Sequence, residues 1–517
     1  MSTSRGSIIF SALFLAAAFA SPGALAAWDP AQGEWGKNDA AYIRVMTWNV
    51  GDGICSTNNK QEGTNNWTAL AVIVASLQPD VLILQEAGDN DGNGTGSYGD
   101  SVSNLLTTIG LFVNGGNDPF NGYVPVTAYV EKYAPGYTLP YIFVSSETDG
   151  FNRDVILSRY PFADLNGDGK STLSDMPYVN ADQYAPGGDG GIRGFQIAEI
   201  NLPDGDYPGD LVVGNSHLKA GGGSSDKAQR LAAGQNIAYL IDYWFNGAGT
   251  GSPDPNGKIN DSPQATQILG SDTPVIWGGD WNEDEATNGR DGPALWMVRA
   301  QTTQNDGTDR DRTDSVYDTA TDPISGSRNT YGSGKLDYLG HQDSIATQRL
   351  GFVFNSASLS SGQRPPELNN FPSPSQASSY ASDHRPVIGD FEVALFSGND
   401  PLPDIKINGQ DGPINIPDTQ PVTMTIHLDP GDHQGTTMDW WIVAEKLGGN
   451  TFSWVYPGSW KSGTRRAIAY PLIPIGSYTI HTGTIPQGLW TIEFSLDTFD
   501  NIYQGTHRDE ILVSSYE

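Results

Sequence analysis

Short apolar runs, each beside a polar cluster, recur through the first three quarters of this sequence. Runs at 42–46, 81–84, 211–213 and 275–277 have the length and composition of buried β-strands. The polar clusters beside these and later segments are Thr47-Trp48-Asn49, Gln85-Glu86, Ser216-His217-Leu218, Gly279-Asp280-Trp281-Asn282, Leu336-Asp337-Tyr338 and Ser382-Asp383-His384-Arg385-Pro386. Strand ends present reactive side chains on a buried scaffold, so we predict that the six clusters close strands and meet in one site.

The pattern changes after residue 395. Residues 396–406 are rich in Gly, Pro, Asn and Asp, which is typical of a linker. Further strand-like runs, separated by turn residues, lie at 422–428, 440–444, 477–480 and 490–496. This spacing predicts a β-sandwich over residues 407–517.

The predicted sandwich contains Trp440, Trp441, Trp454 and Trp460. Aromatic side chains in a small sandwich belong to the core before anything else, so we expect these to be core residues. The alternative is that they form a carbohydrate-binding or other surface-binding face.

The length of 517 residues exceeds what one hydrophobic core usually organises. We therefore expect two domains, at 40–395 and 407–517, joined by the linker at 396–406. Cys55 is the single cysteine, which excludes a disulfide within the chain.

The first 26 residues have the composition of a secretory signal peptide. Arg5 precedes an apolar run from Ile8 to Ala20, and Ala24-Leu25-Ala26 supplies small residues for cleavage after Ala26. We predict a secreted protein, extracellular or periplasmic. The apolar run is short for a membrane span and no other stretch approaches the necessary length, so we predict no span.

The six polar clusters, in this order, resemble those of the endonuclease/exonuclease/phosphatase superfamily, whose members include deoxyribonuclease I-like nucleases, neutral sphingomyelinases and inositol-phosphate phosphatases. The resemblance covers residues 40–395. It implies an α/β (α+β) fold, a four-layer α/β/β/α sandwich in which two mixed sheets are flanked by helices. It also implies an active site at the sheet ends and a metal-dependent phosphoesterase activity.

The oxygen-bearing side chains of these clusters suit a divalent cation. Phosphodiester hydrolysis needs a cation to neutralise phosphoryl charge and a base to assist the attacking water. Glu86 and Asp383 provide hard oxygen ligands, with Asn49 as a third and Asp280 as a further candidate. We predict Mg²⁺ or Mn²⁺ at this site.

Two imidazoles, His217 and His384, are the predicted acid–base groups. The resemblance implies that Asp337 fixes the tautomer of His384 and supports its positive charge. Asp280 is assigned to the catalytic set, and the amide of Asn282 is placed to orient a water or a phosphate oxygen. Which histidine acts as acid and which as base stays open.

Two arginines are candidates for binding phosphate. Arg153 precedes the apolar run 155–157, and Arg193 follows a glycine-rich stretch. A guanidinium can bind phosphate through two parallel hydrogen bonds. An ordinary ion pair at a strand start is the alternative for Arg153.

A loop at 164–175 has the residue spacing of a calcium-binding loop. Oxygen-bearing groups stand at the ligand positions and Gly169 stands at the sharp turn. The predicted structural calcium ligands are Asp164, Asn166, Asp168, Lys170 through its carbonyl, Thr172 and Asp175. A cluster of turn residues is the alternative.

The net charge of −32 argues against a protein that grips nucleic acid through a basic face. It does not exclude an enzyme that holds one phosphate through metal ions. We therefore predict a divalent-metal-dependent phosphodiester hydrolase, an extracellular nuclease with nucleic acid as its substrate. The alternatives are a sphingomyelinase-like phospholipase C or a phosphomonoesterase and, in another class, a binding protein with a vestigial catalytic domain. The sequence does not indicate an oligomeric state.

Overall fold

The computed structural model describes residues 28–51, 54, 60–88, 101–145, 152–165, 167, 172–173, 195–203, 206–207, 209–246, 269, 272–286, 315–343, 345–393, 400–411, 413–499 and 501–517. Helices and strands are mixed up to residue 393, and the region after residue 400 is rich in strands. The predicted α/β class and strand-rich C-terminal region are therefore confirmed. The signal peptide predicted at 1–26 lies outside the described residues. Within the described ranges, no helix is both long and apolar enough to cross a bilayer.

The first large sheet combines the beginning and the end of the mixed region. Its strand order is β15-β16-β3-β4-β8-β7. The strands are β3 (Ile43–Asn49), β4 (Val81–Gln85), β7 (Tyr141–Val144), β8 (Val155–Ser158), β15 (Ala346–Val353) and β16 (Val387–Val393). β3 runs parallel to β4 and antiparallel to β16, so the sheet is mixed.

The second large sheet is built from the chain segment between them. Its strand order is β13-β14-β12-β11-β10-β9. The strands are β9 (Thr172–Leu173), β10 (Phe195–Ile200), β11 (Leu211–His217), β12 (Val275–Asp280), β13 (Ser315–Tyr317) and β14 (Asp337–Gln342). β11 and β12 are parallel, while β14 is antiparallel to β12.

The two sheets pack face to face through alternating side chains. Ile43 and Val45 of β3 join a buried cluster with Val213 and Ile276 of the second sheet. Trp48 belongs to a different cluster, on the outer side of the first sheet. Because successive side chains of a strand point to opposite faces, β3 is buried on both.

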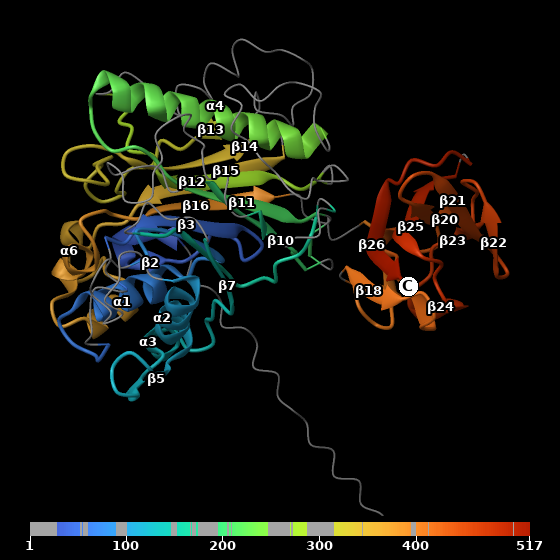
Figure 1. Ribbon diagram of the computed structural model, residues 1–517, viewed down its shortest axis with the longest axis horizontal. Helices are drawn as coiled ribbons and strands as arrows, with labels where there is room; N and C mark the ends of the chain where they lie inside the picture. Colours follow the sequence, from blue (N-terminus) through green and yellow to red (C-terminus); the bar gives the residue numbers. More distant parts are fainter. Residues whose placement is uncertain are drawn as a thin grey trace, which may run out of the picture.

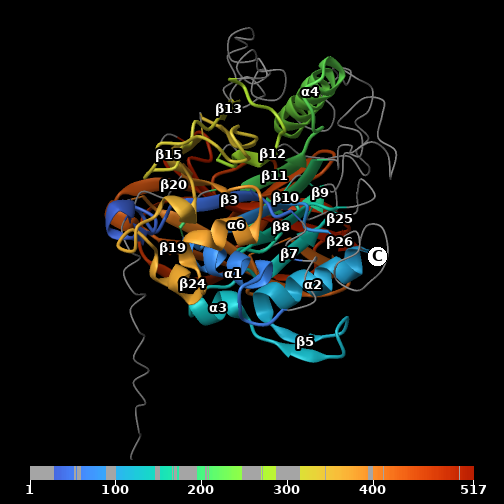
Figure 2. The ribbon, with the colours of Figure 1, turned by 90° about the vertical axis from the view of Figure 1, so that its left-hand side faces the viewer.

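Helices cover the outer faces. α1 (Asn66–Leu77), α2 (Val102–Asn114), α3 (Tyr129–Tyr133) and α6 (Ala377–Ala381) contribute to the cluster around Trp48. α4 (Ser224–Asn246) packs Ala233, Ile237 and Ile241 against Trp277 of the second sheet. In two perpendicular views, α4 lies on one side of the strands and α1, α2 and α3 on the other (Figures 1 and 2).

α1 shows why this sequence forms a buried helix. Asn65 caps its first turn by accepting a hydrogen bond from the backbone N–H of Thr68, at 2.8 Å. The helix is apolar nearly all round and almost every residue in it is buried. Shorter elements complete the mixed region: β1 (Trp28–Asp29), β2 (Glu34–Trp35), β5 (Gly116–Asp118), β6 (Val124–Val126), η1 (Pro30–Gln32), η3 (Ser356–Ser358), η4 (Pro366–Asn370) and η5 (Pro374–Gln376).

A buried ion pair joins the first and last strands of the mixed region. Arg44 of β3 donates from Nε to Asp390 Oδ1 of β16, at 2.6 Å, and from Nη2 to Oδ2, at 2.7 Å. The two residues are 346 positions apart in the chain. Both are buried, so the fork-to-fork geometry compensates two charges that would otherwise be costly to bury.

The C-terminal region forms two further sheets. One has the order β17-β19-β24, and the other the order β18-β26-β25-β20-β21-β22, with β23 also paired to β20. Their strands are β17 (Leu402–Ile407), β18 (Ile414–Pro417), β19 (Val422–Asp429), β20 (Thr437–Lys446), β21 (Asn450–Val455), β22 (Ser459–Ser462), β23 (Ile468–Pro471), β24 (Ile475–Gly483), β25 (Gly488–Thr498) and β26 (His507–Tyr516), with the short η6 (Gly431–His433). Side chains of both sheets, such as Ile426 and Phe494, share one buried cluster.

Among the described residues, this cluster contains none before Ile405, and the clusters of the mixed region contain none after Val393. The four strand-like runs predicted from the sequence fall within β19, β20, β24 and β25. The exact domain and linker boundaries stay a prediction.

Candidate active site

Six segments bring their polar ends to one edge of the two large sheets. Asn49 closes β3 and lies opposite Gln85, the last residue of the parallel strand β4. His217 and Asp280 close the parallel strands β11 and β12 and are direct partners in the ladder. The C-terminal ends of parallel strands share an edge, so these side chains converge.

Two clusters precede strands rather than closing them, which differs from the sequence-based expectation. Asp337 is the first residue of β14, and His384 comes shortly before β16. Both strands are antiparallel to their neighbours, and Asp337 pairs directly with Asp280. The start of an antiparallel strand lies at the edge where its neighbour ends, so the site is still gathered at one place.

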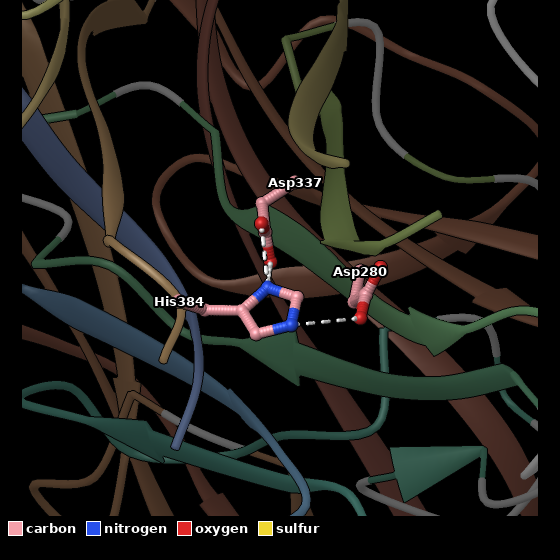
Figure 3. Close-up of side chains that lie close together, drawn as sticks. All are labelled: Asp280, Asp337 and His384. Atoms are coloured by element: carbon pink, nitrogen blue, oxygen red, sulfur yellow. Dashed lines mark hydrogen bonds and ion pairs between the residues drawn. The ribbon is translucent and has the colours of Figure 1, made fainter. Parts of the chain in front are cut away.

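His384 and Asp337 form a buried imidazole–carboxylate pair. The Nδ1 atom of His384 lies 2.9 Å from Oδ2 and 3.2 Å from Oδ1 of Asp337. The other ring nitrogen, Nε2, faces Oδ2 of Asp280 at 3.7 Å, so the ring stands between two carboxylates (Figure 3). Nδ1–H therefore donates to Asp337, which fixes the orientation of Nε2 toward the site.

Charge sets the protonation of this pair. Burial favours the neutral imidazole, but the nearby carboxylates of Asp337 and Asp280 outweigh it and raise the pKa of His384 to about 10. Burial raises the pKa of Asp280 to about 7, an effect that the charge of His384 partly offsets. A cation bound nearby would therefore lower the pKa of Asp280 and favour its ionised form.

Asp280 is the hub of the site. Its Oδ2 accepts a hydrogen bond from Asn49 Nδ2 at 3.0 Å and lies 3.4 Å from Nε2 of His217. Its Oδ1 accepts from the backbone N–H of Asn282 at 2.9 Å. A single buried carboxylate therefore links both histidines and both sheets.

Glu86 brings a second carboxylate to the same place. It has a left-handed backbone, with φ of 52°, immediately after β4. Its Oε1 lies 3.1 Å from Asn49 Nδ2 and 3.7 Å from His217 Nε2. Left-handed backbone is uncommon outside glycine, and here it turns the side chain toward Asn49.

Glu86 and Asp280 offer two carboxylates that fit a divalent cation. Carboxylate oxygens are ligands that Mg²⁺ and Mn²⁺ prefer. The amide of Asn49 faces both carboxylates with its nitrogen, while its oxygen accepts from the backbone N–H of Gly51 at 3.0 Å. Asp280, Asp337 and His384 also offer ligand atoms within 4.8 Å of one another. Asp337 is engaged through both oxygens with His384 Nδ1, which favours orienting the imidazole over holding a cation.

Asp383, a predicted metal ligand, lies at the rim. Its side chain is exposed, and its Oδ1 lies 3.4 Å from the hydroxyl of Ser382. Within the described part of the chain it makes no hydrogen bond or ion pair with Glu86. The carboxylate is near enough to add to the negative field around His384.

The remaining predicted residues lie around or outside this cluster. Asn282 has φ of 51° and donates from its amide to the carbonyl of Leu218, at 3.0 Å. Arg153 is buried, and its guanidinium donates to the carbonyl of Ser145 at 3.1 Å. Its own carbonyl accepts from the backbone N–H of Ala87, the residue after Glu86. Arg193 lies outside the described residues.

The predicted calcium loop falls largely outside the described residues, which include Asp164 and the backbone of Thr172 but not Asn166, Asp168, Lys170 or Asp175. Calcium binding at this loop therefore stays a prediction.

Two groups of supporting contacts were not predicted, although Gln85 and Ser382 belong to the predicted clusters. A buried amide network lies beneath the site, in which Gln85 Nε2 donates to Asn215 Oδ1 at 2.8 Å and Asn215 Nδ2 donates to Gln196 Oε1 at 3.2 Å. This network ties the first sheet to the second directly under Glu86 and His217. Polar residues that interrupt apolar runs were the available signal.

The second group contacts the ring and the backbone of His384. The ring of Tyr331 lies against the imidazole, with centroids 4.6 Å apart, and its backbone forms a bridge to residue 384. The hydroxyl of Ser382 accepts from the backbone N–H of His384 at 3.0 Å. No sequence pattern around Tyr331 indicated this contact, because it depends on the loop between β13 and β14.

No family model and no curated protein sequence matches the chain. Among solved structures, a beta toxin from Staphylococcus aureus is similar at a TM-score of 0.35 and 13% identity, covering 67% of this chain and 99% of the toxin chain. SmcL has a TM-score of 0.34 at 13% identity, covering 68% of this chain and 99% of its own. A variant of the same toxin with bound magnesium ions has the same values as SmcL.

Proposed function

We propose that this chain is a divalent-metal-dependent phosphodiester hydrolase. One observation carries the proposal: the Asp337–His384 pair and His217 face a shared carboxylate, Asp280, beside the carboxylate of Glu86 and the amide of Asn49. This combination places acid–base groups within 4 Å of carboxylates that would hold a cation. The bound cation would neutralise charge on the phosphoryl oxygens.

The side chains have separate tasks in this proposal. Asp337 keeps the proton on Nδ1 of His384, so that Nε2 exchanges a proton with the attacking water or stabilises developing negative charge. His217 is a second imidazole close to the same carboxylate, and it binds a phosphate oxygen or protonates the leaving group. The backbone turn at Asn282 orients Asp280 through its N–H.

Nucleic acid is the substrate class we propose, which rests on the resemblance of the six clusters to nuclease-containing families. The net charge of −32 favours a second candidate, the zwitterionic head group of a phospholipid, over a polyanion. With DNA, raising salt should increase the apparent KM, because screening and competing cations weaken the metal-bridged contact with the phosphates. Secretion, a four-layer sandwich and a structural calcium ion remain parts of this proposal.

A substrate panel tests the proposal. The full chain is assayed on plasmid DNA, RNA, sphingomyelin, bis-p-nitrophenyl phosphate and p-nitrophenyl phosphate, each with magnesium, manganese, calcium or chelator. We expect metal-dependent cleavage of phosphodiesters. Cleavage of sphingomyelin but not DNA or RNA would transfer the assignment to the second candidate, and inactivity on the whole panel would favour a binding protein.

Two substitutions test the site. His384→Ala and Asp337→Asn should each lower turnover by at least about a hundredfold while the protein stays folded, since each disables the imidazole pair. His427→Ala is the matched control, because His427 is a partly exposed histidine on β19. Near-normal turnover in either site variant contradicts the assignment.

A further inference from the structure

The two C-terminal sheets differ in width, and this leaves part of an inner face uncovered. The β17-β19-β24 sheet has three strands, whereas the sheet that it packs against has seven. Trp440 and Trp454 belong to the buried cluster between the two sheets, and Trp441 is buried against Tyr503 outside that cluster. Trp460, on the edge strand β22, is only partly buried, although His481 of the smaller sheet lies against it.

Side chains from both sheets meet at this uncovered edge. Trp460 lies directly across from Trp454 in the β21–β22 ladder, so both project from the inner face. On β24, Tyr478 pairs with Ile426 and His481 pairs with Met424, whose side chains are both in the core. Tyr478 and His481 therefore also stand on the inner side, at the open edge of their sheet.

Ring contacts join these residues into one surface. The ring of Trp454 lies 6.3 Å from Tyr456 and 6.5 Å from Tyr478, centroid to centroid. The Nε1 of Trp460 lies 3.4 Å from Nδ1 of His481. Tyr456 is 54% exposed and Tyr478 43% exposed. We call Tyr456, Trp460, Tyr478 and His481 the aromatic surface.

The charge around the aromatic surface contrasts with that of the whole chain. Residues 447–492 contain no Asp or Glu, although the chain has 60 acidic residues. The basic side chains of this stretch have partners outside the aromatic surface. Lys461 follows Trp460 in β22 and so points to the opposite face. Arg465 donates from Nε to the carbonyl of Ser462, and Arg466 pairs with Asp439 of β20.

Burial lowers the pKa of His481 below its usual value, so this imidazole is neutral at pH 7. The aromatic surface thus combines exposed rings, phenol hydroxyls and a neutral imidazole, without a charged group. A polyanion such as single-stranded nucleic acid requires cations on the same face as the stacking rings. A sugar ring requires an apolar platform for its C–H face and hydrogen-bonding groups at its rim, which Tyr and Trp supply together.

We propose that the aromatic surface binds a neutral polysaccharide and so attaches the protein to a carbohydrate matrix. This inference does not depend on the proposed hydrolase activity, because binding is carried by strands that contain none of the candidate active-site residues. The tyrosines provide the stacking area, and their exposure means that they are available without rearrangement of the core.

The test is binding of the full chain to insoluble cellulose, chitin and starch, with soluble heparin and single-stranded DNA as polyanion probes. We expect retention on at least one neutral polysaccharide. The double variant Tyr456→Ala/Tyr478→Ala should bind it at least about tenfold more weakly, since both stacking rings are lost. Tyr516→Ala is the matched control, because Tyr516 is 49% exposed on β26 and lies outside the aromatic surface.

Each other outcome overturns the proposal. Failure to bind any neutral polysaccharide does so, and so does unchanged binding by the double variant. Binding to heparin or DNA that the double variant loses would show that the surface takes a polyanion instead. Thermal unfolding of each variant, and the single variants Tyr456→Ala and Tyr478→Ala, separate a loss of binding from a loss of fold. Hydrolysis of bis-p-nitrophenyl phosphate, measured in parallel, reports separately on the proposed enzyme.

Discussion

At the scale of single residues, one amide holds two carboxylates together. Asn49 Nδ2 donates to Glu86 Oε1 at 3.1 Å and to Asp280 Oδ2 at 3.0 Å. Without this donor, two negative groups would face each other across a mostly buried site. A neutral amide does not cancel the negative charge of the two carboxylates. A bound cation would cancel part of it, which is why the arrangement favours cation binding.

Asn49→Asp should make stability dependent on metal. A third carboxylate cannot donate, so without metal we expect a loss of roughly 2 kcal/mol in the free energy of unfolding. With saturating Mg²⁺ or Mn²⁺ the variant should recover, and its melting temperature should rise more than that of the wild type. Asn49→Ala, which removes the donor without adding charge, is the comparison. A metal-induced shift in Asn49→Asp no larger than in the wild type would contradict the cation site.

His341 gives a prediction about pH. It is 5% exposed, on β14, and burial lowers its pKa from 6.5 to about 4 despite the opposing charges of Asp343 and Asp318. Between pH 6.5 and 4 the unfolded chain therefore binds more protons than the folded one, so stability falls as pH falls through this window. Between pH 7 and pH 5 this histidine alone should cost roughly 2 kcal/mol.

Urea unfolding of His341→Gln at both pH values checks this. The variant should lose less stability on acidification than the wild type, by that amount. His427→Gln, at a partly exposed histidine, should keep the wild-type pH dependence. Equal pH dependence in His341→Gln and the wild type would mean that His341 is protonated in the fold.

At the scale of elements, the parallel pair β11 and β12 approaches too closely for a side chain at one position. Gly279 has φ of 149°, and a Cβ atom there would lie 1.7 Å from the carbonyl oxygen of Ser216. The next pair in the ladder is His217 and Asp280. The distance between His217 and Asp280 therefore depends on Gly279, which directly precedes Asp280 in β12.

Gly279→Ala should destabilise the fold by at least roughly 3 kcal/mol, because the strands must separate and the backbone is strained. Gly110→Ala is the matched control: no heavy atom lies within 4 Å of the added Cβ, in the middle of α2. It should be neutral or stabilise by about 0.5–1 kcal/mol. Chemical denaturation of both variants, with turnover measured on each, distinguishes these outcomes.

The strands that carry most of the site could be predicted because they are central. β3, β4, β11 and β12 are buried along their whole length, and the apolar run with which each strand begins or continues is a strong signal. The direction of β14 and β16 could not be predicted, because a strand-like run in the sequence does not show whether the strand is parallel or antiparallel to its neighbours. The distances within the site, and the contact of Tyr331 with His384, depend on sheet packing and loop conformation, which one sequence does not display.

At the scale of the whole molecule, the candidate active site and the aromatic surface lie in different parts of the chain. Every candidate active-site residue precedes residue 385, and the buried cluster of the C-terminal sheets begins at Ile405. Truncation after Val393 should therefore leave hydrolysis of bis-p-nitrophenyl phosphate within about twofold of the full chain, as expected for separate cores. It should also abolish retention on polysaccharide. A folded but inactive truncated protein would show that the C-terminal region completes the site.

The pairing of β3 with β16, joined by Arg44 and Asp390, determines when during synthesis the site can form. His384 is delivered to the site by almost the last part of the mixed region to be synthesised, whereas Asn49 is among the first. A nascent chain in which His384 is not yet synthesised cannot assemble the imidazole pair beside the carboxylates of the site. If this protein cleaves the phosphodiesters of its producer, the chain order itself delays that hazard until synthesis of both sheets is complete.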